Sequence, residues 1–231
     1  MPYRRLPNTD QARIRALKQA VDKGEKSNMH DLVFSLKVLT EARSLLQKMD
    51  AAQRYYKQCY DNQARSSTKH QPNVKLARLY ISHFIQVLNM SVLRSEIKKA
   101  HKELYGLPLD NYNLPDLTSE AAIAEWGSKI LEGEQKRISQ GGIPIYNPTI
   151  AKVKVHYDIF IEGYEKQKQL QMMTSRSLET LASMRSDADQ IILEIWNQVE
   201  DKFKDVPTNE IRLNKCREYG IIYYYRSNEK Q

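Results

Sequence analysis

The stretch IAKVKVHYDIFIEGYEKQKQLQMMTSRSLETLASMRSDADQIILEIWNQV (150–199) carries the pattern that decides the fold. Along it, one stripe of residues recurs alternately every three and four positions: Ile150, Val153, Tyr157, Phe160, Tyr164, Gln167, Gln171, Thr174, Leu178, Leu181, Arg185, Ala188, Ile192, Ile195 and Val199. This spacing places side chains on one face of a helix, where they pack against neighbouring helices. The stretch therefore predicts an all-α protein, a bundle of long antiparallel helices.

The middle of this stripe is polar, from Gln167 to Thr174, whereas both ends are apolar. Buried polar residues at such positions can fix register or oligomeric state at a cost in stability. The alternative is that this part of the helix lies in water. The pattern also leaves open whether residues 149–204 form one helix or two, because Ser186-x-x-Asp189 resembles a capping box and favours a turn there.

The composition is that of a globular protein. Of 231 residues, 41% are hydrophobic and 28% are charged, so the chain can bury a sizeable core, and we predict a single helical domain over residues 1–231. No window is apolar enough for a membrane span, and no secretory signal is recognisable. Cys59 and Cys216 stand in no ligand spacing, so we expect free thiols in a reducing compartment and a cytoplasmic protein.

Within this domain the sequence predicts five parts in chain order: an N-terminal arm and short helix (1–30), a helical hairpin (31–105), an irregular connector (106–118), the remaining helices (119–219) and a C-terminal strand or tail (220–231). Prolines, glycines and changes in apolar periodicity mark the borders.

Two of these predictions depend on short stretches. The segment ARSSTKHQPN (64–73) has no apolar periodicity and contains Pro72, so it is expected to be the loop of the hairpin. The pieces 143–146 and 220–226 are both short, β-branched and aromatic, so they are expected to pair as a minor β element.

Motifs for catalysis, metals or nucleotide phosphates are not found in the sequence. None of the five histidines follows a Glu by three residues, and His-Glu-x-x-His, Gly-x-Ser-x-Gly and the Walker pattern do not occur. We therefore expect no catalytic residue, no metal site and no cofactor, and a protein that is not an enzyme.

Charge is distributed unevenly along the chain. Residues 1–105 hold 20 Lys and Arg against 9 Asp and Glu, which gives +11, whereas the remainder has −3. Such an excess can solvate the outer faces of helices, or it can contact nucleic-acid phosphates. The candidate phosphate-binding residues are Arg4, Arg5, Arg13, Arg15, Lys18, Lys98, Lys99 and Lys102.

Three consecutive tyrosines, Tyr223, Tyr224 and Tyr225, stand near the C-terminus. Successive residues of a strand face opposite sides, so at least one ring is expected to be exposed unless both faces are covered. An exposed aromatic edge could bind a partner strand or a second copy of the chain. The alternative is a terminal strand that packs onto the end of the bundle.

Four stretches, LPNTDQARIRALKQAV (6–21), IPIYNPTIAKVKV (143–155), EIWNQVEDKF (194–203) and REYGIIYYYR (217–226), resemble a bacterial family of helical proteins of about this length with no assigned function. The resemblance covers the whole chain and implies a complete natural protein, but it implies no catalytic or binding residue.

Taken together, these features predict a non-catalytic interaction or scaffold protein that associates with itself or with another protein. A nucleic-acid-binding protein that uses the basic N-terminal half is the alternative, and no membrane partner is expected.

Overall fold

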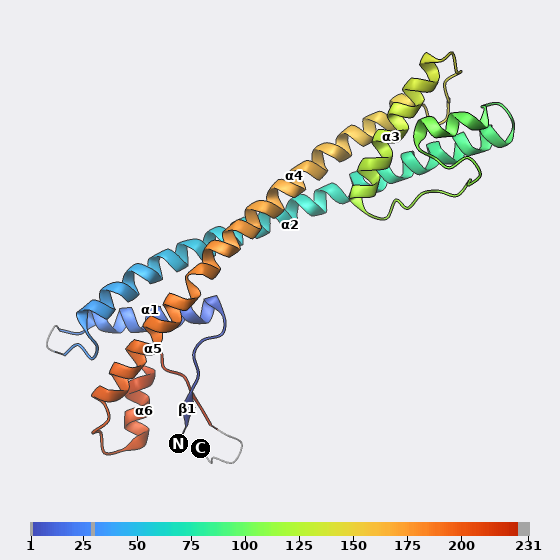
Figure 1. The fold of residues 1–231 in the computed structure, drawn as a ribbon. Helices are drawn as coiled ribbons and strands as arrows, with labels where there is room; N and C mark the ends of the chain where they lie inside the picture. The colour runs from blue at the N-terminus through green and yellow to red at the C-terminus, as the bar shows by residue number, and fades with distance from the viewer. Residues whose placement is uncertain (1, 29–30, 226–231) are drawn as a thin grey trace. The chain divides into compact units, whose positions relative to one another are not determined.

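The computed structural model describes residues 2–28 and 31–225 (Figure 1). The elements in chain order are β1 (Tyr3–Arg4), α1 (Asp10–Lys26), α2 (Leu36–Leu93), the 3-10 helix η1 (Lys99–Tyr105), α3 (Glu120–Ser139), α4 (Ile150–Ser183), α5 (Arg185–Lys202), α6 (Asn209–Arg217) and β2 (Tyr223–Tyr224). The predicted all-α class with a minor β element is confirmed.

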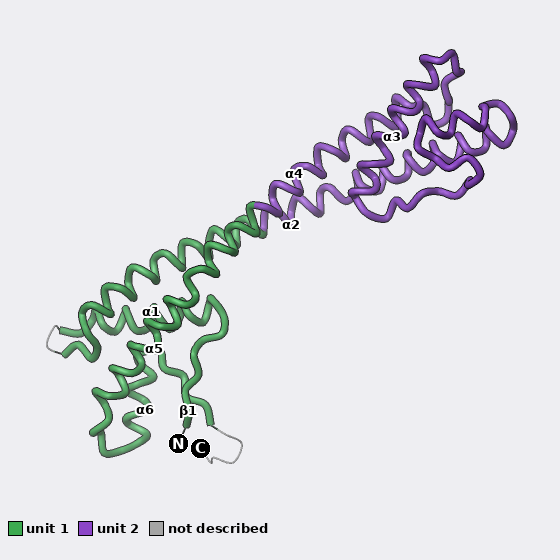
Figure 2. The backbone as a smooth tube through the Cα atoms, in the orientation of Figure 1, with its two compact units in different colours: residues 1–60, 173–231 green, residues 61–172 purple. Residues whose placement is uncertain are grey.

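Two compact units divide the chain (Figure 2). Unit 1 comprises residues 1–60 and 173–231, and unit 2 comprises residues 61–172. Each unit buries its own cluster of apolar side chains, and the long helices α2 and α4 contribute residues to both. That the chain folds as one domain stays a prediction.

Helix α2 continues through the segment that the sequence analysis assigned to a loop. Pro72 lies inside this helix, so the predicted hairpin of residues 31–105 and its loop at 64–73 are wrong. A proline in a helix interior lacks an N–H and clashes with the carbonyl group four residues earlier, at a cost of about 3 kcal/mol. Burial of apolar side chains after the proline offsets this cost, since Val74 is only 4% exposed and Ala77 only 1%.

In unit 1, α1 packs its apolar face into a core that also holds residues of α2, α4, α5 and α6. Thr9 caps α1, because its hydroxyl accepts a hydrogen bond from the Ala12 N–H at 3.2 Å. Leu17 of α1 and Trp196 of α5 are almost completely buried in this core. Burial against the rest of unit 1 stabilises a helix too short to be stable alone.

The C-terminal strand β2 pairs with β1 of the N-terminal arm in antiparallel register. The predicted pairing of 220–226 with 143–146 is therefore wrong. Tyr146 forms an isolated bridge with Thr149 instead. Strands of two residues contribute few hydrogen bonds, so their partner is decided by the packing of the elements that carry them and not by their own sequence.

The question of one helix or two over 149–204 is answered by a break at Met184, between α4 and α5. The Met184 N–H binds the Leu181 carbonyl oxygen at 3.3 Å, a three-residue step that ends the regular α-helical ladder. In the polar middle of the stripe, Gln167 is buried and Gln171 is exposed.

In unit 2, α3 packs against α2 and α4. Ser119 caps α3, as its hydroxyl accepts a hydrogen bond from the Ala122 N–H at 3.1 Å. Ile123 and Ile130 are fully buried, and Gly127 allows close packing because a Cβ there would collide with the ring of Tyr157.

Glu134 and Arg137 continue the buried face of α3 and form an ion pair that we call the α3 ion pair. Arg137 donates to Glu134 through Nε at 2.9 Å and through Nη2 at 2.8 Å, and these two residues are 2% and 0% exposed respectively. The Tyr105 hydroxyl of η1 donates to Glu134 and accepts from Arg137 Nε at 2.9 Å. The Ile145 N–H also donates to Glu134, at 3.2 Å.

Two opposing effects act on the charge of Glu134. Burial favours the neutral carboxyl, but the hydrogen bonds from Arg137, Tyr105 and Ile145 outweigh burial and hold its pKa below the ordinary value. Burial, together with the ionised carboxylate, raises the pKa of Tyr105, which keeps its hydroxyl protonated as a donor.

Candidate nucleic-acid interface

Two of the predicted phosphate-binding residues are held in ion pairs within unit 1. Arg13 is 9% exposed and donates to Asp189 through Nε at 2.8 Å and Nη2 at 2.9 Å. Arg4 donates to Asn197 and lies 3.0 Å from a Glu200 oxygen. These guanidinium groups fasten α1 and the N-terminal arm to α5, so they are not available to a ligand.

The three lysines that were predicted to contact phosphate belong to unit 2 and have three different environments. Lys102 is fully buried and donates to the Asn111 carbonyl oxygen at 2.7 Å, and burial lowers its pKa. Lys99 forms an ion pair with Asp110. Lys98 is exposed. Lys102 and Lys99 therefore fasten the connector after η1, and Lys98 alone of these three is available.

The remaining predicted residues, Arg5, Arg15 and Lys18, are exposed and have no ion-pair partner among the described residues. Arg5 and Arg15 line one cavity of about 390 Å³ together with Tyr3 and Tyr224. The fold thus brings an arginine of the arm, an arginine of α1 and two tyrosines of the sheet to one place. Lys18 does not line this cavity.

A second cavity, of about 260 Å³, adjoins the first, and both are lined by Pro7, Ala12, Arg15 and Ile222. It adds Arg217, which is exposed. No Asp or Glu is among the described residues that line either cavity. We call the two cavities together the arginine groove.

Pairing of the two strands shapes one wall of the arginine groove. Tyr3 lies opposite Tyr224 in the register, and their ring centroids are 5.9 Å apart. The Tyr223 hydroxyl donates to Glu200 at 2.8 Å, and burial raises the pKa of Tyr223, so this residue acts as an anchor for the strand. Tyr224 and Tyr225 are exposed, as expected for at least one ring of the three.

The other wall depends on a close approach between Gly220 and α1. Gly220 has φ of 85°, a conformation that favours glycine, and a Cβ at this position would come within 3.1 Å of the Ala16 carbonyl oxygen. This turn sends Ile221 into the core and Ile222 toward the groove. The groove is therefore built by the packing of unit 1.

Sequence reasoning missed two members of this site, Tyr3 and Arg217. Both stand near residues that were singled out, Tyr3 beside Arg4 and Arg217 shortly before the three tyrosines. What the sequence did not show was that the two chain ends meet, because two-residue strands give too little pattern to identify their partner.

Among residues 2–28 and 31–225, no group of three or more His, Cys, Asp or Glu side chains could hold a metal ion. Cys59 and Cys216 are buried free thiols, and burial raises the pKa of Cys216. No described helix is long and apolar enough to cross a membrane.

Comparisons with protein-family models, with curated proteins and with solved structures found no match to this chain.

Proposed function

We propose that this protein is a non-catalytic binding protein that holds single-stranded nucleic acid in the arginine groove of unit 1. The observation that carries the proposal is the meeting of Arg5, Arg15 and Arg217 at two adjoining cavities whose described lining has no carboxylate. Tyr3 and Tyr224 stand at the same place. The buried free thiols Cys59 and Cys216 are compatible with a reducing compartment such as the cytoplasm.

The chemistry of single strands suits this groove. Proteins that bind single strands without strong sequence preference combine a basic groove along the phosphate backbone with aromatic rings that stack on the bases. The arginines would contact phosphates, and the exposed faces of Tyr3 and Tyr224 would stack on unpaired bases. A duplex keeps its bases stacked inside, so it could use only the arginines.

Fluorescence anisotropy with a labelled oligonucleotide tests the proposal. Binding is measured at about 50 and 200 mM salt for a single strand and for its duplex, since phosphate contacts give a steep salt dependence over this range. We expect the wild type to bind the single strand more tightly and to lose affinity steeply with salt. No binding at the lower salt would contradict the proposal.

Matched variants locate the site. Arg5→Ala with Arg15→Ala should weaken binding at least tenfold and reduce the slope of log K against log salt by about 1.4, because each single-strand phosphate contact contributes about 0.7. Arg65→Ala with Arg176→Ala removes two exposed arginines elsewhere and should leave affinity close to the wild type. Equal losses in the two double variants would show that only net charge matters.

The tyrosines have a test of their own. Replacing Tyr224 by Ser should weaken binding of the single strand by the equivalent of about 1–3 kcal/mol per lost stacking contact and leave duplex binding unchanged. A loss shared by both nucleic acids would contradict stacking.

Self-association is a second candidate function, and a bare apolar face of unit 2 favours it. Leu76 and Leu79 of α2 and Val155 and Ile159 of α4 are between 40% and 59% exposed. Helical periodicity places them away from α3. A second copy that presented the same two helices would complete a four-helix layer with two-fold symmetry.

Sedimentation velocity tests this second candidate over a range of protein concentration. Leu79→Lys with Val155→Lys should shift the protein toward monomer, whereas Leu193→Lys with Ile211→Lys, at exposed apolar positions of unit 1, should not. A wild type that stays monomeric at all concentrations would exclude self-association through this face.

A further inference from the structure

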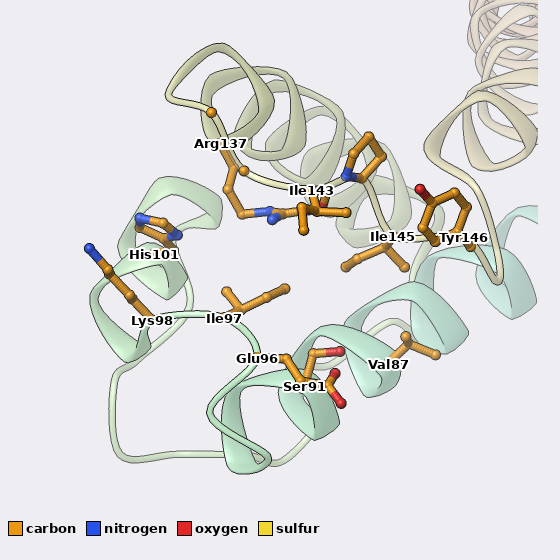
Figure 3. A pocket seen from close by; sticks show the side chains of 13 residues that line it. Val87, Ser91, Glu96, Ile97, Lys98, His101, Arg137, Ile143, Ile145 and Tyr146 are labelled. Atoms are coloured by element: carbon orange, nitrogen blue, oxygen red, sulfur yellow. The ribbon is translucent and has the colours of Figure 1, made fainter.

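Unit 2 contains a cavity of about 520 Å³ that the arginine groove does not involve (Figure 3). Its wall comes from the end of α2, the start of η1, the end of α3 and the loop of residues 141–146. Its volume lies within the range of about 300–1,000 Å³ that is usual for small-molecule sites. We call it the unit 2 pocket.

Arg137 brings a buried guanidinium group to this pocket. Figure 3 shows its side chain reaching in beside Ile143. Its Nε and Nη2 atoms are engaged with Glu134, Tyr105 and the Ile143 carbonyl oxygen, but no hydrogen bond joins Nη1 to another described residue. Gly142 leaves room at that atom, since a Cβ there would lie 2.8 Å from Nη1.

Two further nitrogen-bearing side chains, Lys98 and His101, stand on one side of the same pocket (Figure 3). The Nδ1 atom of His101 is enclosed and has no hydrogen-bond partner among the described residues. A buried polar atom without a partner is costly, and a ligand acceptor would remove that cost. Lys98 has no ion-pair partner among the described residues.

The charges that line the pocket favour a singly charged over a doubly charged anion. The Arg137 charge is balanced by Glu134, and one carboxylate, Glu96, lines the pocket together with Lys98, which balances it. A doubly charged phosphate would therefore bring two uncompensated charges, whereas a monocarboxylate would bring one and accept hydrogen bonds from Arg137 Nη1 and His101.

The remainder of the lining is apolar. Ile97 and Ile145 are buried at the pocket, and Ile143 and Tyr146 at its rim are 75% and 76% exposed. Large apolar side chains so exposed beside a cavity are suited to cover the apolar body of a ligand. We propose that the unit 2 pocket binds a small organic monocarboxylate, whose charged end meets Arg137 and His101 and whose apolar chain lies against Ile97, Ile143 and Ile145.

Isothermal titration calorimetry with octanoate as the probe tests this site. We expect saturable binding at millimolar or lower concentration, and at least tenfold weaker binding of 1-octanol, which has the chain without the charge. Inorganic phosphate, which has charge without the chain, should bind more weakly still. Absence of saturable octanoate binding, or equal affinity for octanol, would overturn the proposal.

Variants that leave the α3 ion pair intact can identify which residues of the unit 2 pocket bind octanoate. Lys98→Gln with His101→Gln should weaken octanoate binding at least tenfold, and Ile143→Ser should weaken octanoate and octanol alike. Lys75→Gln with His83→Gln alters exposed residues of unit 2 outside the pocket and should bind as the wild type does. Circular dichroism verifies that each variant keeps its helical content, and an unchanged affinity in the first double variant would place the ligand elsewhere.

Discussion

Each unit contains an arginine that binds a carboxylate through Nε and Nη2, but the two pairs differ in their access to water. In unit 1, Arg13 binds Asp189, and the two side chains are 11% and 31% exposed. In unit 2, Arg137 binds Glu134, and the side chains are 2% and 0% exposed. The first pair joins helices that are far apart in the sequence, whereas the second lies within one helix and adds the Tyr105 hydroxyl.

The comparison shows how access to water changes the cost of removing one partner of an ion pair. A partly exposed pair can replace a lost partner with solvent, so each of its members is worth little. A buried pair has no such replacement, and removal of one partner leaves an uncompensated charge at a cost of about 3–5 kcal/mol. The α3 ion pair should therefore dominate the response of unit 2 to substitution.

Glu134→Gln provides the largest expected effect. The variant leaves Arg137 buried and without its counter-charge, so it should lower the free energy of unfolding of unit 2 by about 3–5 kcal/mol. Native-state hydrogen exchange with mass spectrometry measures this, because it reports on each unit separately. The control is Glu132→Gln, an exposed position two residues earlier on α3. Similar hydrogen-exchange rates in Glu134→Gln and Glu132→Gln would mean that burial does not determine the cost of losing the carboxylate.

Tyr105→Phe removes only the hydroxyl that lies between the two charges. Arg137 keeps both of its hydrogen bonds to Glu134, so we expect a smaller loss of about 1.5–3 kcal/mol, which is the usual range for a hydrogen bond to a charged group. Urea denaturation followed by hydrogen exchange in unit 2 measures it. A loss as large as that of Glu134→Gln would show that the tyrosine and the ion pair act as one indivisible network.

Sequence alone predicted the helical class with a minor β element, because this follows from local spacing and composition. It failed at Pro72, where a local penalty of about 3 kcal/mol indicated a loop. The penalty is offset by burial of side chains such as Val74 and Ala77 against distant parts of unit 2. No pattern within residues 64–73 contains that information.

Charged residues on apolar stripes were the other missed feature. Glu134 and Arg137 follow Ile123, Gly127 and Ile130 in alternating steps of four and three, and this spacing is the signal that could have indicated their burial. The same reasoning applies to Arg13, which precedes Leu17 by four positions.

Two further features of the candidate sites were beyond prediction from sequence. The arginine groove required the pairing of β1 with β2, and the unit 2 pocket required the convergence of α2, η1, α3 and the loop of residues 141–146. Neither feature produces a recognisable pattern in the local spacing of residues.

Arg13→Ala tests the pair that is in part accessible to water. Asp189 regains water when the guanidinium is lost, so the free energy of unfolding of unit 1 should fall by only about 1 kcal/mol. The effect should shrink more at about 1 M salt than that of Glu134→Gln, because salt screens charges that are in contact with water and screens buried pairs much less. Arg54→Ala removes a fully surface-located pair with Asp50 and serves as the control. If Arg13→Ala lowered the free energy of unfolding by several kcal/mol and salt did not change this loss, the two ion pairs would not differ in the way proposed.

A further expected effect is the acid response of the α3 ion pair. Because the folded pKa of Glu134 is lowered, its contribution to stability is fully present above the ordinary carboxyl value of about 4.3 and is lost as the pH falls through the folded pKa. The difference in unfolding free energy between wild type and Glu134→Gln should therefore be constant from pH 7 to about 5 and then shrink, by about 1.4 kcal/mol for each unit by which the pKa is lowered. Hydrogen exchange of α3 amides over this pH range measures the difference, with Glu132→Gln expected to keep the wild-type profile. A difference that grows on acidification would mean that the buried carboxyl is already protonated in the folded protein, and that burial outweighs the three hydrogen bonds it accepts.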